Sequence, residues 1–177
     1  PISGDVDPVE IELPSGWQVE AGAGVVAAGV EIEQCQHVQV GRQQVEDLLV
    51  GRPPRAAADF LAAWGATLND ERLDGSLRAL ALALPDERVL AQSMDVVAVD
   101  EIHQARSALM RSLAQAHGEA LRRLHDSRCG KPYTANRSAI DMRRLANTAL
   151  AYLCSSSQPE DLDLALRQFD RADNMTD

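Results

Sequence analysis

The strongest pattern in this 177-residue sequence is a stripe of apolar residues along residues 100–126. Its members recur every three or four positions, which at about 100° per residue places them on one face of a helix. Asp100 is a candidate N-cap for this helix. A helix ending near Asp126 would be roughly 40 Å long at about 1.5 Å per residue. The stripe consists of Ile102, Ala105, Leu109, Leu113, Ala116, Ala120 and Leu124.

Shorter helices are predicted before this stripe. Asp74 is placed to cap one helix and Pro85 to end it. Asp86 and Glu87 then begin another short helix, where negative charge in the first turn is favourable. The apolar face of the first of these helices consists of Leu77, Leu80, Ala81 and Leu84.

Two more amphipathic helices are predicted after the stripe. The last one begins at Pro159, with acidic residues in its first turn. In that helix Leu162, Ala165, Leu166 and Phe169 are expected to point inward. The apolar face of the helix before it consists of Met142, Leu145, Ala146, Ala149, Tyr152 and Leu153.

This succession of helices predicts a mainly α fold. Residues 59–177 are expected to form an antiparallel helical array, in which helix pairs stack as they do in solenoids. No fixed-period repeat is visible in the sequence. Aromatic residues make up only 3% of the chain, so Leu, Ala and Val must provide most of the packing.

The first 58 residues have a different character. Their apolar residues tend to alternate, and Gly and Pro interrupt them, which is typical of strands and turns. Residues 1–58 are therefore expected to be an irregular, β-like or disordered segment. The alternating residues are Val9, Ile11, Leu13, Val30, Ile32, Val38 and Val40.

The net charge of −10 excludes some classes of partner. Sequence-independent binding to nucleic acid or to an anionic membrane depends on clustered Lys and Arg. No apolar run reaches the ~20 residues that span a bilayer, and no secretory leader is visible. The three cysteines lie far apart, which favours reduced thiols and a cytoplasmic location.

The sequence contains no recognisable active-site motif. His-Glu-x-x-His and Cys-x-x-Cys are both absent. His125 with Cys129, and Cys35 with His37, have spacings that allow contact with one metal ion, but two ligands are too few for a zinc site. We therefore expect no catalytic residue and no metal ligand in this chain.

Two polar residues lie on the apolar stripe, Arg106 and His117. One interpretation is that both are partly buried and hydrogen-bonded to neighbouring helices. In the other interpretation they face a cleft, where Arg106 binds a carboxylate.

The second half of the chain carries four stretches whose order and spacing are distinctive. They are Leu73–Gly75 with Ala81–Glu87, Val99–His103 with Ala105 and Arg106, Arg144–Asn147 continuing to Leu153, and Gln168–Phe169 with Ala172–Asp177. Together these stretches resemble the C-terminal helical domain of bacterial-type aminopeptidase N, also called alanyl aminopeptidase, a zinc metallopeptidase. The resemblance covers about residues 60–177.

This resemblance implies that the chain is an internal piece of a larger enzyme. In the family, a thermolysin-like domain binds zinc through His-Glu-x-x-His and a downstream Glu, and a Gly-Ala-Met-Glu-Asn motif binds the free amine of the substrate. Neither motif is present here, so zinc is expected in the parent enzyme and not on this segment. The segment would cap the active-site chamber, limit access to peptides with free N-termini, contact the remaining domains and be inactive alone.

Three expectations accompany this interpretation. Residues 1–58 lie outside the resemblance and are either a remnant of the preceding β-sandwich or an out-of-frame translation. The alternative to an enzyme fragment is a stand-alone helical scaffold whose groove binds a peptide or protein. An array that lacks its closing helices leaves an apolar face uncovered, which predicts marginal stability or self-association.

Overall fold

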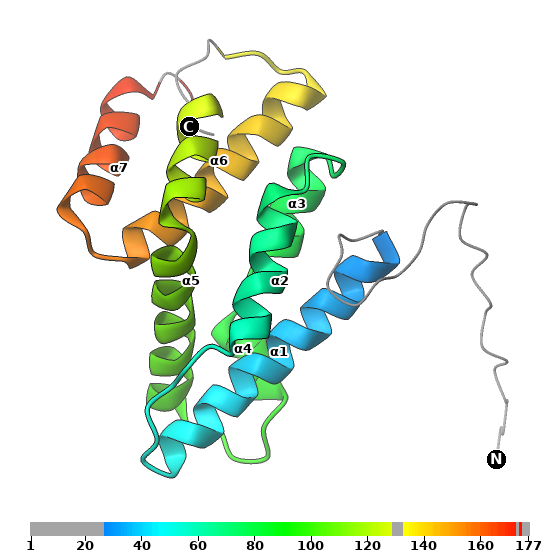
Figure 1. Ribbon diagram of the computed structural model, residues 1–177, viewed down its shortest axis with the longest axis vertical. Helices are drawn as coiled ribbons and strands as arrows, with labels where there is room; N and C mark the ends of the chain where they lie inside the picture. The colour runs from blue at the N-terminus through cyan, green and yellow to red at the C-terminus, as the bar shows by residue number, and fades with distance from the viewer. Residues whose placement is uncertain (1–26, 129–132, 173, 175–177) are drawn as a thin grey trace, which may run out of the picture.

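The computed structural model describes residues 27–128, 133–172 and 174 (Figure 1). Within these residues the chain forms seven helices and no strand, which confirms the predicted mainly α fold. The helices are α1 (Ala27–Leu49), α2 (Ala58–Asn69), α3 (Gly75–Leu82), α4 (Glu87–Gln92), α5 (Val99–Arg128), α6 (Arg137–Ser155) and α7 (Pro159–Arg171).

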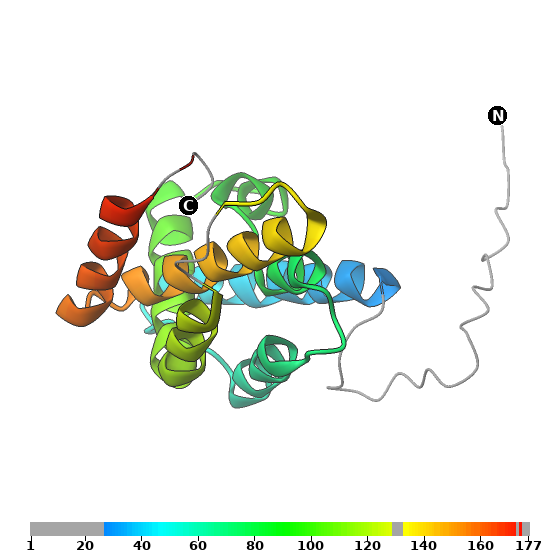
Figure 2. The same ribbon diagram turned by 90° about the horizontal axis from the view of Figure 1, so that it is seen from above.

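The long helix α5 organises the array. It packs most extensively on α6 and also contacts α1, α2 and α4, while α6 packs on α3 as well. Seen from above, α6 passes across α5, and α7 lies at the outer edge of the molecule in both views (Figures 1 and 2). The space between α5, α6, α3 and α2 therefore contains the main core.

Two groups of buried apolar side chains stabilise this arrangement. The larger group joins α2, α3, α5 and α6, and the smaller one joins the end of α1 to α4 and the start of α5. The smaller group contains Val45, Leu90, Ile102 and Ala105. The larger group contains Trp64, Leu68, Ala79, Leu82, Leu84, Leu109, Leu113, Leu121, Leu145, Ala149, Tyr152 and Leu153.

The helix starts agree with the local signals in the sequence. The Asp74 carboxylate accepts a hydrogen bond from the backbone N–H of Leu77 at 2.8 Å, as expected of an N-cap. Asp86 caps α4 in the same way, through the N–H of Val89 at 2.8 Å. Helix α5 begins one residue earlier than expected, so Asp100 lies in its first turn rather than at its cap.

The first half of the α5 stripe is confirmed. In its second half Ala120 and Leu124 are partly buried and pack against the main core, and Ala116 is exposed. The helix is interrupted at His117, whose φ of −124° and ψ of 15° are not helical. Beyond this point the buried side chains are Leu121 and His125, neither of which belongs to the expected stripe. A local change of backbone conformation alters the direction of every side chain that follows it. The members buried as expected are Ile102, Ala105, Leu109 and Leu113.

The strand prediction for the end of the first segment is wrong. Residues 27–49 form α1, so Val30, Ile32, Val38 and Val40 are helical. The buried residues of this helix have a helical spacing, but several of them are polar or small, which hid the period from the sequence pattern. Over residues 36–49, where the side chains of α1 are described, they are His37, Gly41, Gln44 and Val45. The remaining alternating positions, Val9, Ile11 and Leu13, lie outside the described residues.

The inward face predicted for α7 is wrong. The face predicted for α3 is confirmed at Ala81 and Leu84, which are buried, and is wrong at Leu80. In α7 the side chains of Leu162, Leu166 and Phe169 are 46%, 62% and 79% exposed, and Asp161 is buried instead. In α3, Leu80 is 47% exposed, while Arg78 is buried. The orientation of both helices is therefore set by polar contacts to neighbouring helices, described below. The apolar face predicted for α6 is confirmed, since five of its six members are buried and Met142 is partly buried.

Candidate functional site

The end of α3 is the point where four helices meet. The last carbonyl groups of a helix have no partner within the helix and need donors from elsewhere. The carbonyl of Leu82 accepts two such bonds, from Trp64 Nε1 of α2 at 3.1 Å and from the Tyr152 hydroxyl of α6 at 2.5 Å. Burial raises the pKa of Tyr152, so the hydroxyl remains a donor at neutral pH.

The segment that follows α3 receives two more donors. His37 Nδ1 of α1 lies 3.1 Å from the carbonyl oxygen of Ala83. Because a carbonyl only accepts, Nδ1 carries the proton. Burial is the main influence on this imidazole and lowers the pKa of His37. Arg106 Nε of α5 donates to the carbonyl of Pro85 at 3.0 Å.

His117 makes a similar contact to α2. Its Nε2 lies 2.9 Å from the carbonyl oxygen of Leu61, and its ring stacks on Trp64 with centroids 5.5 Å apart. The ring lies directly over Gly65, where an added Cβ would be 2.4 Å from His117 Cε1. Arg106 and His117 are thus both partly buried and bonded to neighbouring elements. A cleft-facing role for either residue stays a prediction.

His125 connects the last three helices. Its Nε2 lies 2.8 Å from Gln168 Oε1 of α7, and Gln168 Nε2 donates to Asn147 Oδ1 of α6 at 2.7 Å. Its expected metal partner, Cys129, lies outside the described residues. The side chain of Cys35, the other candidate, is likewise not described. Among the described residues, no three His, Cys, Asp or Glu side chains are grouped so that they could hold a metal ion.

The buried carboxylate of Asp161 and the partly exposed guanidinium of Arg122 form an ion pair that the sequence pattern did not predict. Arg122 Nε and Nη2 donate to the two carboxylate oxygens at 2.7 and 2.8 Å, and Ser156 Oγ donates at 2.8 Å. Burial alone would raise the pKa of Asp161, but the hydrogen bonds from Arg122 and Ser156 outweigh it, and the pKa is lowered. This contact attaches the start of α7 to α5.

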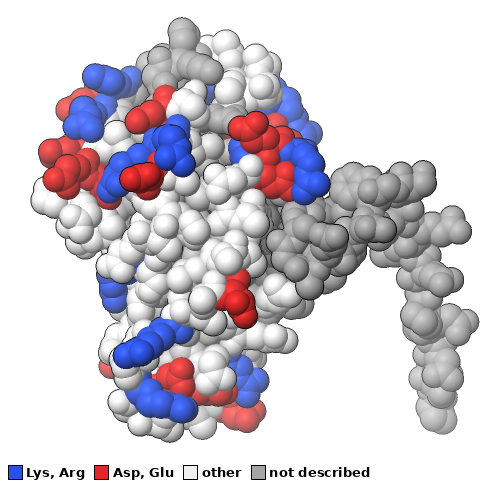
Figure 3. Space-filling model, viewed as in Figure 1, with Lys and Arg blue, Asp and Glu red and all other residues white. Residues whose placement is uncertain are grey.

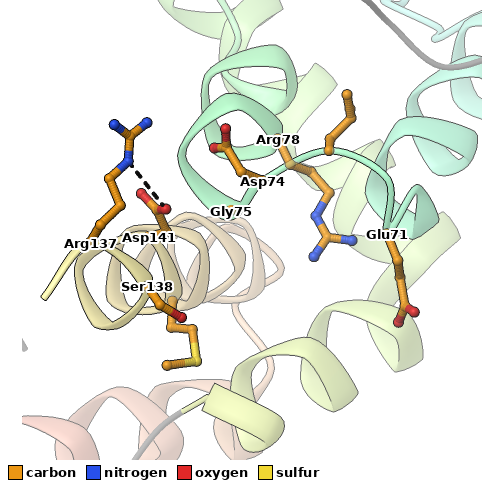
Figure 4. Close-up of a pocket in the computed structure, with 9 residues that line it drawn as sticks. Glu71, Asp74, Gly75, Arg78, Arg137, Ser138 and Asp141 are labelled. Atoms are coloured by element: carbon orange, nitrogen blue, oxygen red, sulfur yellow. Dashed lines mark ion pairs between the residues drawn. The ribbon is translucent and has the colours of Figure 1, made fainter.

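A cavity of about 550 Å³ lies between the loop before α3 and the first turn of α6 (Figure 4). Asp141 on its wall accepts a hydrogen bond from Ser76 and forms an ion pair with Arg137 at 3.7 Å. Arg78 donates to the carbonyl of Leu68 at 3.3 Å. The cavity is lined by Glu71, Leu73, Asp74, Gly75, Arg78, Arg137, Ser138, Asp141 and Met142.

Charged groups of both signs line this cavity: the carboxylates of Glu71, Asp74 and Asp141, and the guanidinium groups of Arg78 and Arg137. Asp74 caps α3, Asp141 pairs with Ser76 and Arg137, and no His or Cys lines the cavity. Ser138 in this lining therefore has no imidazole beside it to act as a base. Neither Arg106 nor His117 lines this cavity. The arrangement is that of a contact between two helix starts and lacks the parts of a hydrolytic centre.

Stacked helix pairs joined through buried polar contacts define this chain as an α-helical repeat domain. Residues 33–177 match one family model, described as "Domain of unknown function (DUF3458_C) ARM repeats", and the chain belongs to that family. The match begins within the first segment, at a residue of α1, and so extends further toward the N-terminus than the resemblance found in the sequence. Residues 1–32 precede the match. For them the two interpretations, a β-sandwich remnant or an out-of-frame translation, stay predictions.

Curated relatives confirm the resemblance to aminopeptidase N. The chain is 27% identical over 163 residues to aminopeptidase N of Escherichia coli, and this alignment covers 92% of this chain and 17% of the relative. It is 28% identical over 158 residues to aminopeptidase N of Caulobacter vibrioides, covering 86% of this chain and 18% of the relative. The chain therefore spans less than a fifth of the length of these relatives.

A solved structure has the same fold. The crystal structure of Legionella pneumophila aminopeptidase A in complex with aspartic acid superposes with a TM-score of 0.68 at 18% identity. The superposition covers 84% of this chain and 18% of that one. None of the described helices is both long enough and apolar enough to cross a membrane.

Proposed function

We propose that the chain is the non-catalytic helical part of a zinc-dependent aminopeptidase, which releases N-terminal amino acids from peptides. The observation that carries this proposal is the continuous family match over residues 33–177, together with two aminopeptidase N relatives that align with most of the chain. In the parent enzyme this part would cap the active-site chamber and restrict entry to peptides with free N-termini. A cytoplasmic location belongs to the same proposal.

The residues described here do not fit a zinc site. Zinc in a hydrolase needs three protein ligands and an open position, and the described residues contain no such group. In this proposal the zinc ion and the catalytic residues are therefore held by another part of the parent. The role of this chain is steric, since a rigid array of packed helices determines what can enter.

A first experiment measures the activity of the chain alone. The purified chain is incubated with an alanyl anilide and zinc, next to the parent enzyme. We expect turnover from the parent only. Turnover by the isolated chain that a chelator abolishes would refute the proposal.

A second experiment tests the capping role in the parent enzyme. Its turnover of an alanyl anilide is compared with its turnover of a folded protein that has a free N-terminal Ala, before and after deletion of this region. We expect the deletion to raise turnover of the protein relative to the anilide. An unchanged ratio in a folded deletion variant would contradict the capping role.

The alternative is a stand-alone helical scaffold that binds a peptide or protein. The exposed apolar face of α7 is the feature that favours it. The coding sequence upstream separates the two proposals: an in-frame His-Glu-x-x-His supports the enzyme, and a start codon directly before Pro1 supports the scaffold.

A further inference from the structure

Helix α1 packs on the rest of the array through a face that is poor in apolar side chains. Over residues 36–49 the buried positions are His37, Gly41, Gln44 and Val45. Two of the four are polar, and Gly41 has no side chain, so that Leu90 of α4 fits against its backbone. Partly buried Val38, Val40 and Leu48 complete the contact. Because hydrophobic stabilisation scales with the apolar area removed from water, we expect α1 to be bound more weakly than the helices of the main core.

The amide of Gln44 weakens the docking of α1 further. Gln44 is 3% exposed, and its Oε1 is buried without a hydrogen-bond partner among the described residues. An acceptor that is buried without a donor has lost its hydrogen bonds to water and gained none in return. When α1 separates from the array, water satisfies this oxygen again, which favours the released helix.

His37 makes the one hydrogen bond that joins residues 36–49 of α1 to the array of α2–α7. Its Nδ1 donates to the carbonyl of Ala83 at 3.1 Å, and its ring packs against Phe60 of α2 with centroids 5.5 Å apart. The side chain is 5% exposed, and this burial lowers the pKa of His37. A charged ring at this position would be almost without water, so docking favours the neutral imidazole.

No charge on the neighbouring elements compensates a proton on His37. Two guanidinium groups reach inward from the helices that pack on α1. Arg78 of α3 donates to the carbonyl of Leu68, and Arg106 of α5 donates to that of Pro85. Both groups are positive, so neither can neutralise a charged imidazole. On α1 itself, Arg42 pairs with Glu46 and Asp47 pairs with Arg52.

The carboxylates around α1 lie at the surface. On the face shown in Figure 3, charged side chains gather toward the two ends of the molecule and few lie between them. Within the described part of the chain, no carboxylate is hydrogen-bonded to or ion-paired with His37. The acidic residues of the elements next to α1 are exposed, except for Glu101, which is partly exposed; the exposed ones are Asp59, Asp74, Asp86, Glu87 and Asp100.

Helix α1 can separate without disrupting the main core. The larger group of buried apolar side chains contains no buried residue of α1. In the smaller group α1 contributes Val45 alone, next to Leu90, Ile102 and Ala105 of α4 and α5. Residues 50–57, which connect α1 to α2, include no buried residue. Segments with few buried apolar contacts open as units at lower free energy than the whole fold.

We infer that α1 is an acid-sensitive clamp, which is docked while His37 is neutral and separates from the array of α2–α7 as one unit when His37 takes up a proton. Release uncovers Leu90 and Ile102, which α1 covers in the docked state together with Val45. The device thus converts a change of pH into the exposure of one side of α4 and α5.

The direction of the pH effect follows from linkage. The pKa of His37 in the docked state lies below its ordinary 6.5, so release is least favourable above pH 6.5. Each pH unit between 6.5 and the docked pKa favours release by at most tenfold. Acidification from about pH 7.5 to about pH 5 therefore raises the equilibrium constant for release by up to about 30-fold.

Hydrogen exchange of the full 177-residue chain, followed by NMR at these two pH values and corrected for intrinsic exchange rates, tests this inference. Amides of residues 41–45 in α1 are compared with those of Leu145 and Ala149 in α6. We expect α1 to be at least about tenfold less protected than α6 at both pH values. The protection of α1 should fall on acidification by up to about 30-fold. Equal protection of the two helices would show that α1 opens only when the whole array unfolds, and would overturn the inference.

Two histidine variants assign the effect. His37→Asn keeps a donor close to the position of Nδ1 but does not titrate, so the fall in α1 protection should disappear. His103→Gln is the matched control, since His103 of α5 is exposed and pairs with Glu87 of α4, and it should leave the fall unchanged. A fall that persists in His37→Asn, or disappears in His103→Gln, would show that another group is responsible. Circular dichroism confirms that the variants are folded, and His37→Gln replaces His37→Asn if the latter is not.

A third variant tests the weak docking itself. Gln44→Leu removes the unpaired acceptor without adding a titratable group, so α1 should gain protection by a similar factor at both pH values. The fall on acidification should remain, because His37 is still present. Lower protection of α1 in a folded Gln44→Leu chain would contradict the weak docking on which the inference depends.

Discussion

Arg122 of α5 and Asp161 of α7 form a two-pronged ion pair whose two ends differ in exposure. The Asp161 side chain is 1% exposed, whereas Arg122 is 42% exposed. The two hydrogen bonds measure 2.7 and 2.8 Å. Because a buried carboxylate must be paired, this contact fixes the rotation of α7 and turns its apolar row away from the core.

The ion pair should respond asymmetrically to the loss of either partner. Arg122→Ala leaves a buried carboxylate with Ser156 as its remaining side-chain donor and should lower the free energy of unfolding by about 2–4 kcal/mol. Asp161→Asn leaves a half-exposed guanidinium that water can solvate, and should cost about 1–2 kcal/mol. Urea unfolding of both variants measures the difference. Equal costs would show that the burial of Asp161 does not matter.

Stability should fall as the solution becomes acidic, in two steps. Folding lowers the pKa of His37 below its ordinary 6.5. The contribution of the neutral imidazole to the free energy of unfolding is therefore complete above pH 6.5 and is lost as the pH falls toward the folded pKa. The folded pKa of Asp161 is also lowered, from 3.8, so its contribution is lost at still lower pH. One such group changes the free energy of unfolding by at most about 1.4 kcal/mol per pH unit.

His37→Gln separates the first step from the second. Glutamine keeps a donor that can reach the carbonyl of Ala83 but does not titrate. The variant should therefore lose the decline in unfolding free energy just below pH 6.5 and keep the one at lower pH. Urea unfolding across the pH range measures both. A decline identical to that of the wild type would assign the first step to another group.

Most helices were predictable because their signals are local. The caps Asp74 and Asp86 and the face of α6 depend on residues within a few positions of each other. Such patterns remain visible in a single sequence. The same holds for the absence of active-site motifs from the sequence.

The features that were missed depend on distant partners. The buried face of α1 includes two polar residues, His37 and Gln44, so the sequence pattern does not mark this face as buried. His37 can be buried because the fold brings the carbonyl of Ala83 to its imidazole. The rotation of α7 depends on Arg122, which lies 39 positions before Asp161. No periodicity in the sequence reports such contacts, although the polar atom of a buried Trp or Tyr usually has a hydrogen-bond partner.

Trp64 and Tyr152 should stabilise the fold in a coupled way, because both donate to the carbonyl of Leu82. Tyr152→Phe alone removes one of two donors and should cost about 1 kcal/mol. Trp64→Phe should cost more, since packing is lost as well. The double variant leaves the buried carbonyl without these donors and should cost more than the sum, by about 1 kcal/mol. A double-mutant cycle in urea measures the excess, and simple additivity would contradict the shared acceptor.

Two helical glycines should respond in opposite directions to replacement by alanine. In an ordinary helix interior this change stabilises by about 1 kcal/mol. At Gly118 the nearest atom to an added Cβ is Arg122 Nη1 at 3.4 Å, an ordinary van der Waals distance, so Gly118→Ala should raise the melting temperature. At Gly65 the Cβ would lie 2.4 Å from the His117 ring, which is held by its contacts to Leu61 and Trp64. Gly65→Ala should therefore lower the melting temperature, and the double variant Gly65→Ala with His117→Ala should lose this steric penalty. If Gly65→Ala were as stabilising as Gly118→Ala, the His117 ring would not be fixed over α2.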